Sequence, residues 1–211
     1  MNGMRARIAA GPAALLVCLA LGAAGLVGAQ PQRLTVDPVK SHVRLELGRS
    51  GLMKFMGHEH QIEAPLAEGH VEVVEDDPAR SSVELRFEAA RLAIVPGSEP
   101  ADDIPKVEER MRGPEVLEVA KYPEILFHSS SVKSTRQGEG FKLVVTGTLT
   151  LKGRSVPVEI PLDARRVDGG IEAKGETKLE LRALGIEPPS VAGVVKVSNE
   201  FKLAFEIHAR P

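Results

Sequence analysis

The chain has 211 residues, a formal net charge of −2, six phenylalanines, one tyrosine and no tryptophan. A near-neutral charge argues against general binding to a phosphate backbone, and so few aromatic rings argue against stacking on single-stranded nucleic acid. We therefore expect no nucleic-acid partner. The only cysteine is Cys18, which leaves the rest of the chain without disulfides, thiol nucleophiles or thiolate metal sites.

Residues 1–29 predict a secretory signal peptide. Arg5 and Arg7 precede an apolar run over 8–28, and Val27-Gly28-Ala29 has the small-residue pattern of a cleavage site. A retained membrane anchor is the alternative, because the run approaches the ~20 residues that span a bilayer. Cleavage near Ala29 leaves 30–211 as a single domain with 25 basic and 29 acidic residues, a formal charge of −4. We expect it in the periplasm or secreted.

Two-residue alternation of apolar and polar side chains, which is typical of β-strands, recurs along the rest of the chain. One stretch, 82–94, loses its alternation near Ala89-Ala90, where we expect a bulge. The segment 52–62 is a more ambiguous strand. The clearer strands are predicted over 33–38, 41–47, 69–74, 124–132, 170–184 and 194–209.

The strongest hairpin signal lies at 140–162, where alternation continues on both sides of a short turn containing Gly153. Pro157 and Pro161 are four residues apart, so their missing N–H groups belong to the same lateral side of the second strand. We predict that this strand pairs fully with one neighbour and poorly with the other.

One segment changes period and predicts a short helix over 102–112. Ile104, Val107 and Met111 recur at helical spacing, Asp103 is a suitable N-cap, and Gly113-Pro114 ends the segment. Eight or so strands with steady turn spacing and one helical insertion indicate an all-β sandwich or barrel. Long, two-faced strands favour an antiparallel barrel of about eight strands, which can enclose side chains or one small ligand.

Four motifs, in order, resemble the YceI-like proteins, a family of periplasmic and secreted lipid-binding, lipocalin-like β-barrels. The resemblance covers nearly all of 30–211 and rests on Val36-Asp37-Pro38 with Ser41 and Val43, Tyr122-Pro123 with Phe127 and Ser129, Gly147 to Gly153, and Arg182 to Ile186 leading into the last strand. It implies a non-enzymatic carrier that holds a polyisoprenoid or similar long-chain amphiphile in an apolar interior. It implies no cofactor, only transient membrane contact for ligand exchange, and leaves a homodimer open.

The resemblance also implies which residues meet the ligand. The helix is expected to cap one end of the barrel, with Arg110 and Arg112 facing a phosphate head group; an ordinary solvated helix face is the alternative for both. The apolar candidates for lipid binding are Leu45, Val73, Leu85, Phe87, Ile104, Val107, Met111, Leu117, Phe127, Val145, Leu149 and Phe205.

Two other classes of function remain as alternatives. His58 and His60 share a strand face and could bind one metal ion, with His42, His70 or His128 as a third ligand; two solvated histidines are the plainer interpretation. A stress-response interaction module without a small ligand is the other class. Neither a nucleophile elbow nor a glycine-rich phosphate loop occurs, so nothing in the sequence supports catalysis.

Overall fold

Alternating apolar and polar residues form strands along most of the chain that this computed structural model describes, which comprises residues 30–50, 60–191 and 195–211. The first half contains β1 (Gln32–Val36), β2 (His42–Ser50), β3 (His60–Glu63), β4 (Leu66–Val73), β5 (Ser82–Glu88) and β6 (Ala93–Ile94). The second half contains α1 (Ile104–Arg112), β7 (Glu124–Gln137), β8 (Gly140–Leu151), β9 (Arg154–Val167), β10 (Gly170–Glu180), β11 (Ser190–Val191) and β12 (Val195–Arg210).

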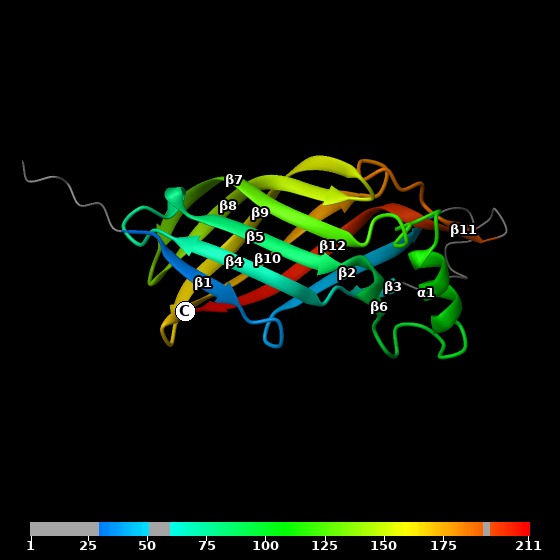
Figure 1. The fold of residues 1–211 in the computed structure, drawn as a ribbon. Helices are drawn as coiled ribbons and strands as arrows, with labels where there is room; N and C mark the ends of the chain where they lie inside the picture. Colours follow the sequence, from blue (N-terminus) through cyan, green and yellow to red (C-terminus); the bar gives the residue numbers. More distant parts are fainter. Residues whose placement is uncertain (1–29, 51–59, 192–194) are drawn as a thin grey trace, which may run out of the picture.

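The strands close into an antiparallel barrel with eight positions, as the sequence predicted (Figure 1). Around the ring these are β1, β4, β5, β7, β8, β9, β10 and β12, and β1 pairs with β12 to complete it. Three positions hold two strands in succession. β1 and β2 share one position, since both pair with β12. β3 pairs with β2 and shares the position of β4, and β6 pairs with β3 and shares the position of β5.

The interruptions between these paired strands have local causes. Asp37 Oδ1 accepts hydrogen bonds from the backbone N–H of Val39 (3.0 Å) and Lys40 (3.3 Å), which turns the chain between β1 and β2. The bulge predicted near Ala89-Ala90 is wrong in form. There the chain makes a 3₁₀ turn, η3 (Ala89–Arg91), and the buried Ala89 donates its N–H to the Pro123 carbonyl (2.8 Å).

The two prolines of β9 control its pairing, as predicted. β9 pairs with β8 along its length from Arg154 to Arg165, opposite Leu151 to Gly140. Its pairing with β10 begins only at Leu162, immediately after Pro161. Because both prolines lack an N–H, the first half of β9 has no regular ladder on that side, and the barrel has a seam between β9 and β10.

The two ends of the barrel differ. The helix end carries α1, which lies at the right of Figure 1. The turn end consists of the β4–β5, β7–β8 and β9–β10 connections, at 74–81, 138–139 and 168–169. The 3₁₀ turn η2 (Pro78–Arg80) lies in the first of these, and the C-terminus lies at this end too.

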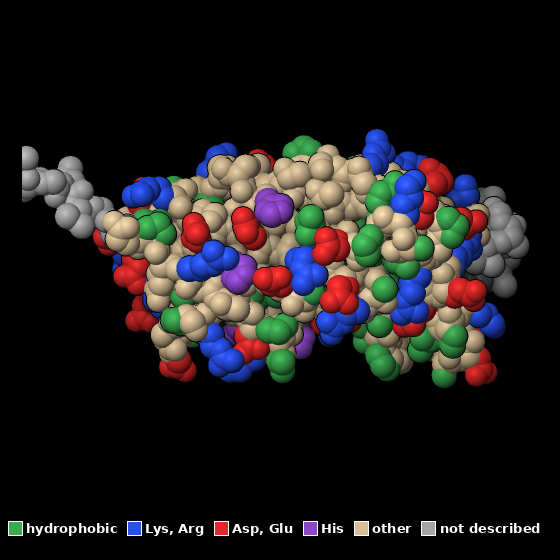
Figure 2. All heavy atoms as spheres, in the orientation of Figure 1, with side chains coloured by type: hydrophobic (Ala, Val, Ile, Leu, Met, Phe, Trp, Pro, Cys, Tyr) green, Lys and Arg blue, Asp and Glu red, His purple; other side chains and the backbone are tan. Residues whose placement is uncertain are grey.

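The outer surface is charged and mixed in sign. Figure 2 shows Lys and Arg side chains interspersed with Asp and Glu over the visible face, with scattered hydrophobic groups between them. Within the described residues, we find no helix with the length and apolar character needed to cross a membrane.

Candidate functional site: an apolar cavity in the barrel

A cavity of about 560 Å³ lies inside the barrel. Its walls are the inward-facing alternate residues of the strands, such as Leu143 and Val145 on β8 and Leu203 and Phe205 on β12. The volume is within the roughly 300–1,000 Å³ typical of small-molecule sites. Since most of the wall is aliphatic and aromatic, the cavity suits a largely apolar ligand.

The cavity is long as well as apolar. On β8 its lining extends from Phe141 near the turn end to Leu151 at the helix end. Ten residue steps of a strand span about 33 Å. With the usual strand tilt in a barrel, this corresponds to about 25 Å along the axis, which suits an extended chain better than a compact molecule.

Most of the predicted lipid contacts line this cavity. Ile104 and Val107 do not; both are on α1 and pack, partly buried, against the hydrophobic core. The predicted residues that line the cavity are Leu45, Val73, Leu85, Phe87, Met111, Leu117, Phe127, Val145, Leu149 and Phe205. Contact of any of them with a ligand stays a prediction.

Buried apolar side chains close the helix end among the described residues. Met111 points inward from α1, and Leu117 follows in the turn after the helix. Leu184 and Ile186, from the connection after β10, complete the closure. Backbone hydrogen bonds from Leu117 N–H to the Met111 carbonyl (3.0 Å) and from Ile186 N–H to the Leu181 carbonyl (2.9 Å) hold these segments in place.

The charged residues of the described lining all lie at the turn end, where the cavity reaches solvent. We call them the mouth: Glu75, Asp76, Arg136, Glu139, Arg165 and Arg166. Arg166 forms an ion pair with Glu75, and Arg165 forms one with Glu172 (2.9 Å). The Arg136 guanidinium lies 5.8 Å from the centre of the Phe141 ring, which itself lines the cavity. The cavity is therefore apolar along its length and charged at one end.

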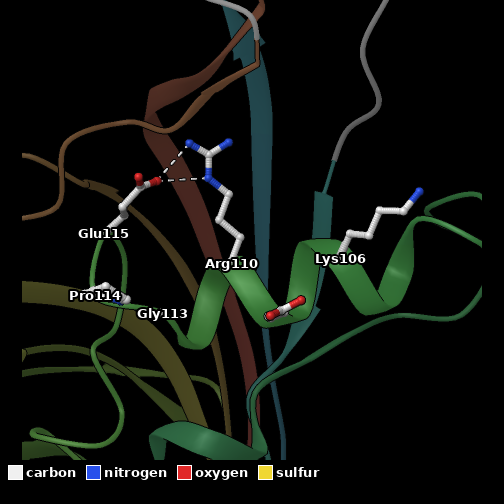
Figure 3. Close-up of a pocket in the computed structure, with 6 residues that line it drawn as sticks. Lys106, Arg110, Gly113, Pro114 and Glu115 are labelled. Carbon is white, nitrogen blue, oxygen red and sulfur yellow. Dashed lines mark hydrogen bonds and ion pairs between the residues drawn. The ribbon is translucent and has the colours of Figure 1, made fainter.

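The structure places Arg110, a predicted head-group residue, outside the cavity. It lines a separate, open hollow of about 430 Å³ beside α1, which shares no described lining residue with the cavity. Figure 3 shows its guanidinium directed toward Glu115, with Lys106 pointing away from both. The Glu115 carboxylate accepts from Arg110 Nη2 (2.9 Å), and the Ser190 carbonyl accepts from Arg110 Nη1 (3.0 Å).

Arg112, the other predicted head-group residue, is also absent from the lining. Its guanidinium donates to the carbonyls of Ala90 (3.0 Å) and Leu92 (3.3 Å) and to the Glu108 carboxylate (3.1 Å). Glu108 in turn accepts from the Ile94 N–H (3.0 Å). These contacts fasten α1 to the segment between β5 and β6. A role for either arginine at a head group stays a prediction.

The histidines proposed for a metal site do not come together in the described part of the structure. His58 lies outside the described residues, and His60 Nδ1 is 2.5 Å from Oε1 of the buried Glu99. The other three are each beside a carboxylate: His42 beside Glu63, His70 beside Glu68 and His128 beside Glu84.

A different set of three metal-type ligands, Glu172, Glu206 and His208, lies on the outer face of β10 and β12. The Lys174 ammonium is 3.2 Å from Glu172 and 3.1 Å from Glu206, where it supplies the positive charge that a cation would bring. Hydrogen bonds from His208 and Lys174 lower the pKa of Glu206. The pKa of Lys174 is raised in turn by its hydrogen bonds to Glu206 and Glu172. We interpret this set as a charge network of the barrel wall.

Sequence reasoning missed the mouth, although one signal for it was present. Arg166 has the same parity as Val158, Ile160 and Leu162 on β9, which makes it an inward-facing charge near the end of an otherwise apolar strand face. A charge at such a position indicates the rim of a barrel, where the inward-facing side chains reach solvent. The partner of Arg166, Glu75, lies in a turn between β4 and β5, and no local pattern connects the two.

Comparison with known proteins agrees with this architecture. The family model of the YceI-like domain matches residues 34–209. The proteins named YceI from Salmonella arizonae and Salmonella newport are each 37% identical over 83 residues, which cover 35% of this chain and 40% of each relative. The chain thus matches well under half the length of these relatives.

Two solved structures share the fold at low sequence identity. BcnA from Burkholderia cenocepacia matches with a TM-score of 0.63 and 18% identity, over 82% of this chain and 98% of BcnA. A polyisoprenoid binding domain from Saccharophagus degradans, implicated in plant cell wall breakdown, matches with a TM-score of 0.61 and 14% identity, over 84% of this chain and 97% of that domain.

Proposed function

We propose, from the premise that this chain belongs to the YceI-like domain family, that its barrel binds a long-chain amphiphile such as a polyisoprenoid. One observation carries the proposal: the cavity is long and apolar, and its described residues close it with buried side chains at the helix end and make it charged at the turn end. A molecule with an apolar chain and a polar head matches that gradient. The polyisoprenoid binding domain with the same fold supports the choice of ligand class.

The hydrophobic effect can supply the affinity. Removing about 300 Å² of ligand hydrocarbon from water contributes roughly 7 kcal/mol at about 25 cal/mol per Å². Part of that is offset by the lost freedom of the ligand on binding. The resulting affinity is adequate for a carrier that takes up and releases its cargo.

The proposal includes binding rather than catalysis and export to the periplasm or beyond. The leader-like residues 1–29 motivate the proposed export. Among the described lining residues we find no nucleophile with an adjacent base, since the inner part of the wall is apolar and the charged groups lie at the rim. Membrane contact, in this proposal, is limited to ligand exchange.

The test is native mass spectrometry of the processed protein from its own host, followed by organic extraction. We expect a stoichiometric adduct that extracts as an isoprenoid or acyl chain. The stripped protein should then bind retinol, a fluorescent isoprenoid alcohol. A clean apoprotein mass, unchanged after incubation with retinol and with long-chain fatty acids, would contradict the proposal.

A pair of variants ties binding to the cavity. Ala173 lines the cavity on β10, whereas Ala204 on β12 has the opposite parity to the lining residues Leu203 and Phe205. Ala173→Trp should reduce retinol binding by occupying cavity volume, and Ala204→Trp should leave it unchanged. Equal binding by the two folded variants would show that retinol binds elsewhere.

A further inference from the structure

An ion pair links two strands on opposite sides of the barrel at the mouth. Glu75 follows the end of β4, and Arg166 lies near the end of β9. Around the ring, β5, β7 and β8 separate these strands in one direction, and β1, β12 and β10 separate them in the other. β4 and β9 are therefore diametrically opposed, and the pair spans the mouth.

Both members of the pair also line the cavity. The lining includes Glu75 and Arg166, together with Asp76 and Pro78 from the same connection as Glu75. Among the described residues, the cavity lining at the helix end is apolar, with Leu184 3% and Ile186 2% exposed. The described lining of the cavity thus has one charged end, and this ion pair crosses it.

The pair is suited to open. The side chains of Arg166 and Glu75 are 44% and 58% exposed, so water can solvate both charges once they separate. Exposed ion pairs are held weakly and are screened by salt. A buried pair would resist opening, because separating it leaves charges without partners in a low dielectric.

We propose that ligand enters and leaves through the turn end and that the Arg166–Glu75 ion pair is a strap across this entrance, which opens for each exchange. This inference rests on the proposed function, since it concerns the traffic of the same cavity. It assigns a route and a gating contact.

The first test measures how fast retinol leaves the loaded protein when it is mixed with an excess of phosphatidylcholine vesicles. Glu75→Gln and Arg166→Gln should each speed release by about 1.5- to 5-fold, the range that corresponds to an exposed ion pair. Release from the wild type should quicken with added salt, and release from the variants should depend less on salt. Rates that match the wild type at every salt concentration would overturn the proposal.

Charge reversal separates the strap from a general effect of altered side chains. E75R places two arginines across the mouth and should release retinol faster than the wild type. The double variant E75R/R166E restores an ion pair of opposite polarity and should return the rate toward the wild-type value. Glu200→Gln is the control, because it removes an exposed ion pair with Lys178 (2.8 Å) outside the cavity lining, and it should not alter release.

A covalent strap gives the sharpest result. Because the only cysteine is Cys18, the double variant E75C/R166C in a Cys18→Ser background presents just two thiols. A short bis-maleimide across them should slow retinol release and uptake at least tenfold, and labelling with a monofunctional maleimide should not. Unchanged exchange in the cross-linked protein would place the route elsewhere.

The two proposals fail in different ways. If no preparation binds retinol or carries a lipid, the proposed function fails. If retinol binds and Ala173→Trp weakens it, but exchange is indifferent to charge reversal and cross-linking, the carrier function stands and the strap is refuted.

Discussion

At the scale of single residues, Gly147 shows how closely the cavity wall is packed. A Cβ at this position would lie 2.6 Å from ring atoms of Phe127 and 2.5 Å from the His128 carbonyl oxygen. Phe127 lines the cavity across the β7–β8 pairing, so its ring occupies the space that a side chain at 147 would need. The glycine therefore permits the wall to form.

We expect Gly147→Ala to destabilise the barrel by about 1–3 kcal/mol, the usual cost of overpacking. Urea denaturation measures this directly. Gly48→Ala is the matched control: among the described residues its Cβ would meet only Ser198 Cβ, at 3.9 Å, which is an ordinary contact. This substitution should change stability by no more than about 0.5 kcal/mol. Equal stabilities of the two variants would contradict this account of the wall.

Glu172 gives the barrel wall a dependence on pH. Burial alone would raise the pKa of this carboxyl, but hydrogen bonds from Arg165 and Lys174 outweigh burial and hold the pKa below its usual range. A lowered folded-state pKa stabilises the fold fully above the unfolded-state pKa, about 4.3 for glutamate, and the gain disappears as pH falls through the folded-state value.

Glu172→Gln should therefore lower the free energy of unfolding by about 1–2 kcal/mol at pH 7, and the difference from the wild type should shrink toward pH 3. Urea denaturation at several pH values measures it. Glu187, whose pKa is lowered by its hydrogen bond to Arg182, is 74% exposed, so Glu187→Gln should change stability little at any pH. A deficit for Glu172→Gln that does not vary with pH would refute the linkage.

At the scale of elements, α1 is fastened to the barrel by polar contacts as well as by packing. Arg112 donates to two carbonyls between β5 and β6, and Glu108 accepts from the Ile94 N–H. Met111, between them on the helix surface, enters the cavity. The polar contacts thus set the position of the apolar closure.

Arg112→Ala should lower stability by about 1–3 kcal/mol, because it leaves partly buried acceptors without their charged donor. Hydrogen exchange should quicken in α1 and at 90–94 and remain unchanged in β8. Lys106→Ala, which removes an exposed contact with Asp103, serves as the control and should do neither. If Arg112→Ala instead weakened retinol binding with no change in hydrogen exchange, the predicted head-group role would gain support.

Helices and strands were predictable where the apolar residues recur with a clear period, and less so where contacts between distant residues determine the local structure. The 140–162 hairpin, the 104–112 helix and the long last strand follow directly from two-residue and helical periods. The turn at Ala89 depends on a bond to the Pro123 carbonyl, more than thirty residues away, and no local signal encodes it. The same holds for the partners of Arg110 and Arg112.

At the scale of the whole molecule, stability should be linked to cargo. A ligand that binds only the folded barrel stabilises it by about 2.7 kcal/mol when present at 100 times its Kd. Stripped protein should therefore melt at a lower temperature than protein reloaded with retinol, as differential scanning calorimetry would show. Ala173→Trp should lose this retinol-dependent rise in melting temperature, and Ala204→Trp should keep it. An equal rise in both variants would show that retinol does not stabilise the protein from within the cavity.

For the whole molecule, the sequence predicted which residues face inward but not whether they enclose a cavity. Alternation predicts which residues face inward, and ten of the twelve proposed lipid contacts line the cavity. Whether inward residues fill a barrel or leave a space depends on its closed diameter, which is a property of all eight strands together. The charged mouth depends on turns that meet only after closure.

The placement of the first and last strands of the described chain has a practical consequence for measurements of ligand exchange. Gln32 at the start of β1 pairs with Val73, two residues before Glu75, and Ala209 near the end of β12 pairs with Ile171, close to Arg166 in the adjacent hairpin. A purification tag or fusion partner joined at the C-terminus, or directly before residue 30 of the processed protein, therefore stands beside the mouth, where it can obstruct cargo or supply stray charge. Ligand exchange should therefore be measured on tag-free protein, or on protein attached through the helix end of the barrel.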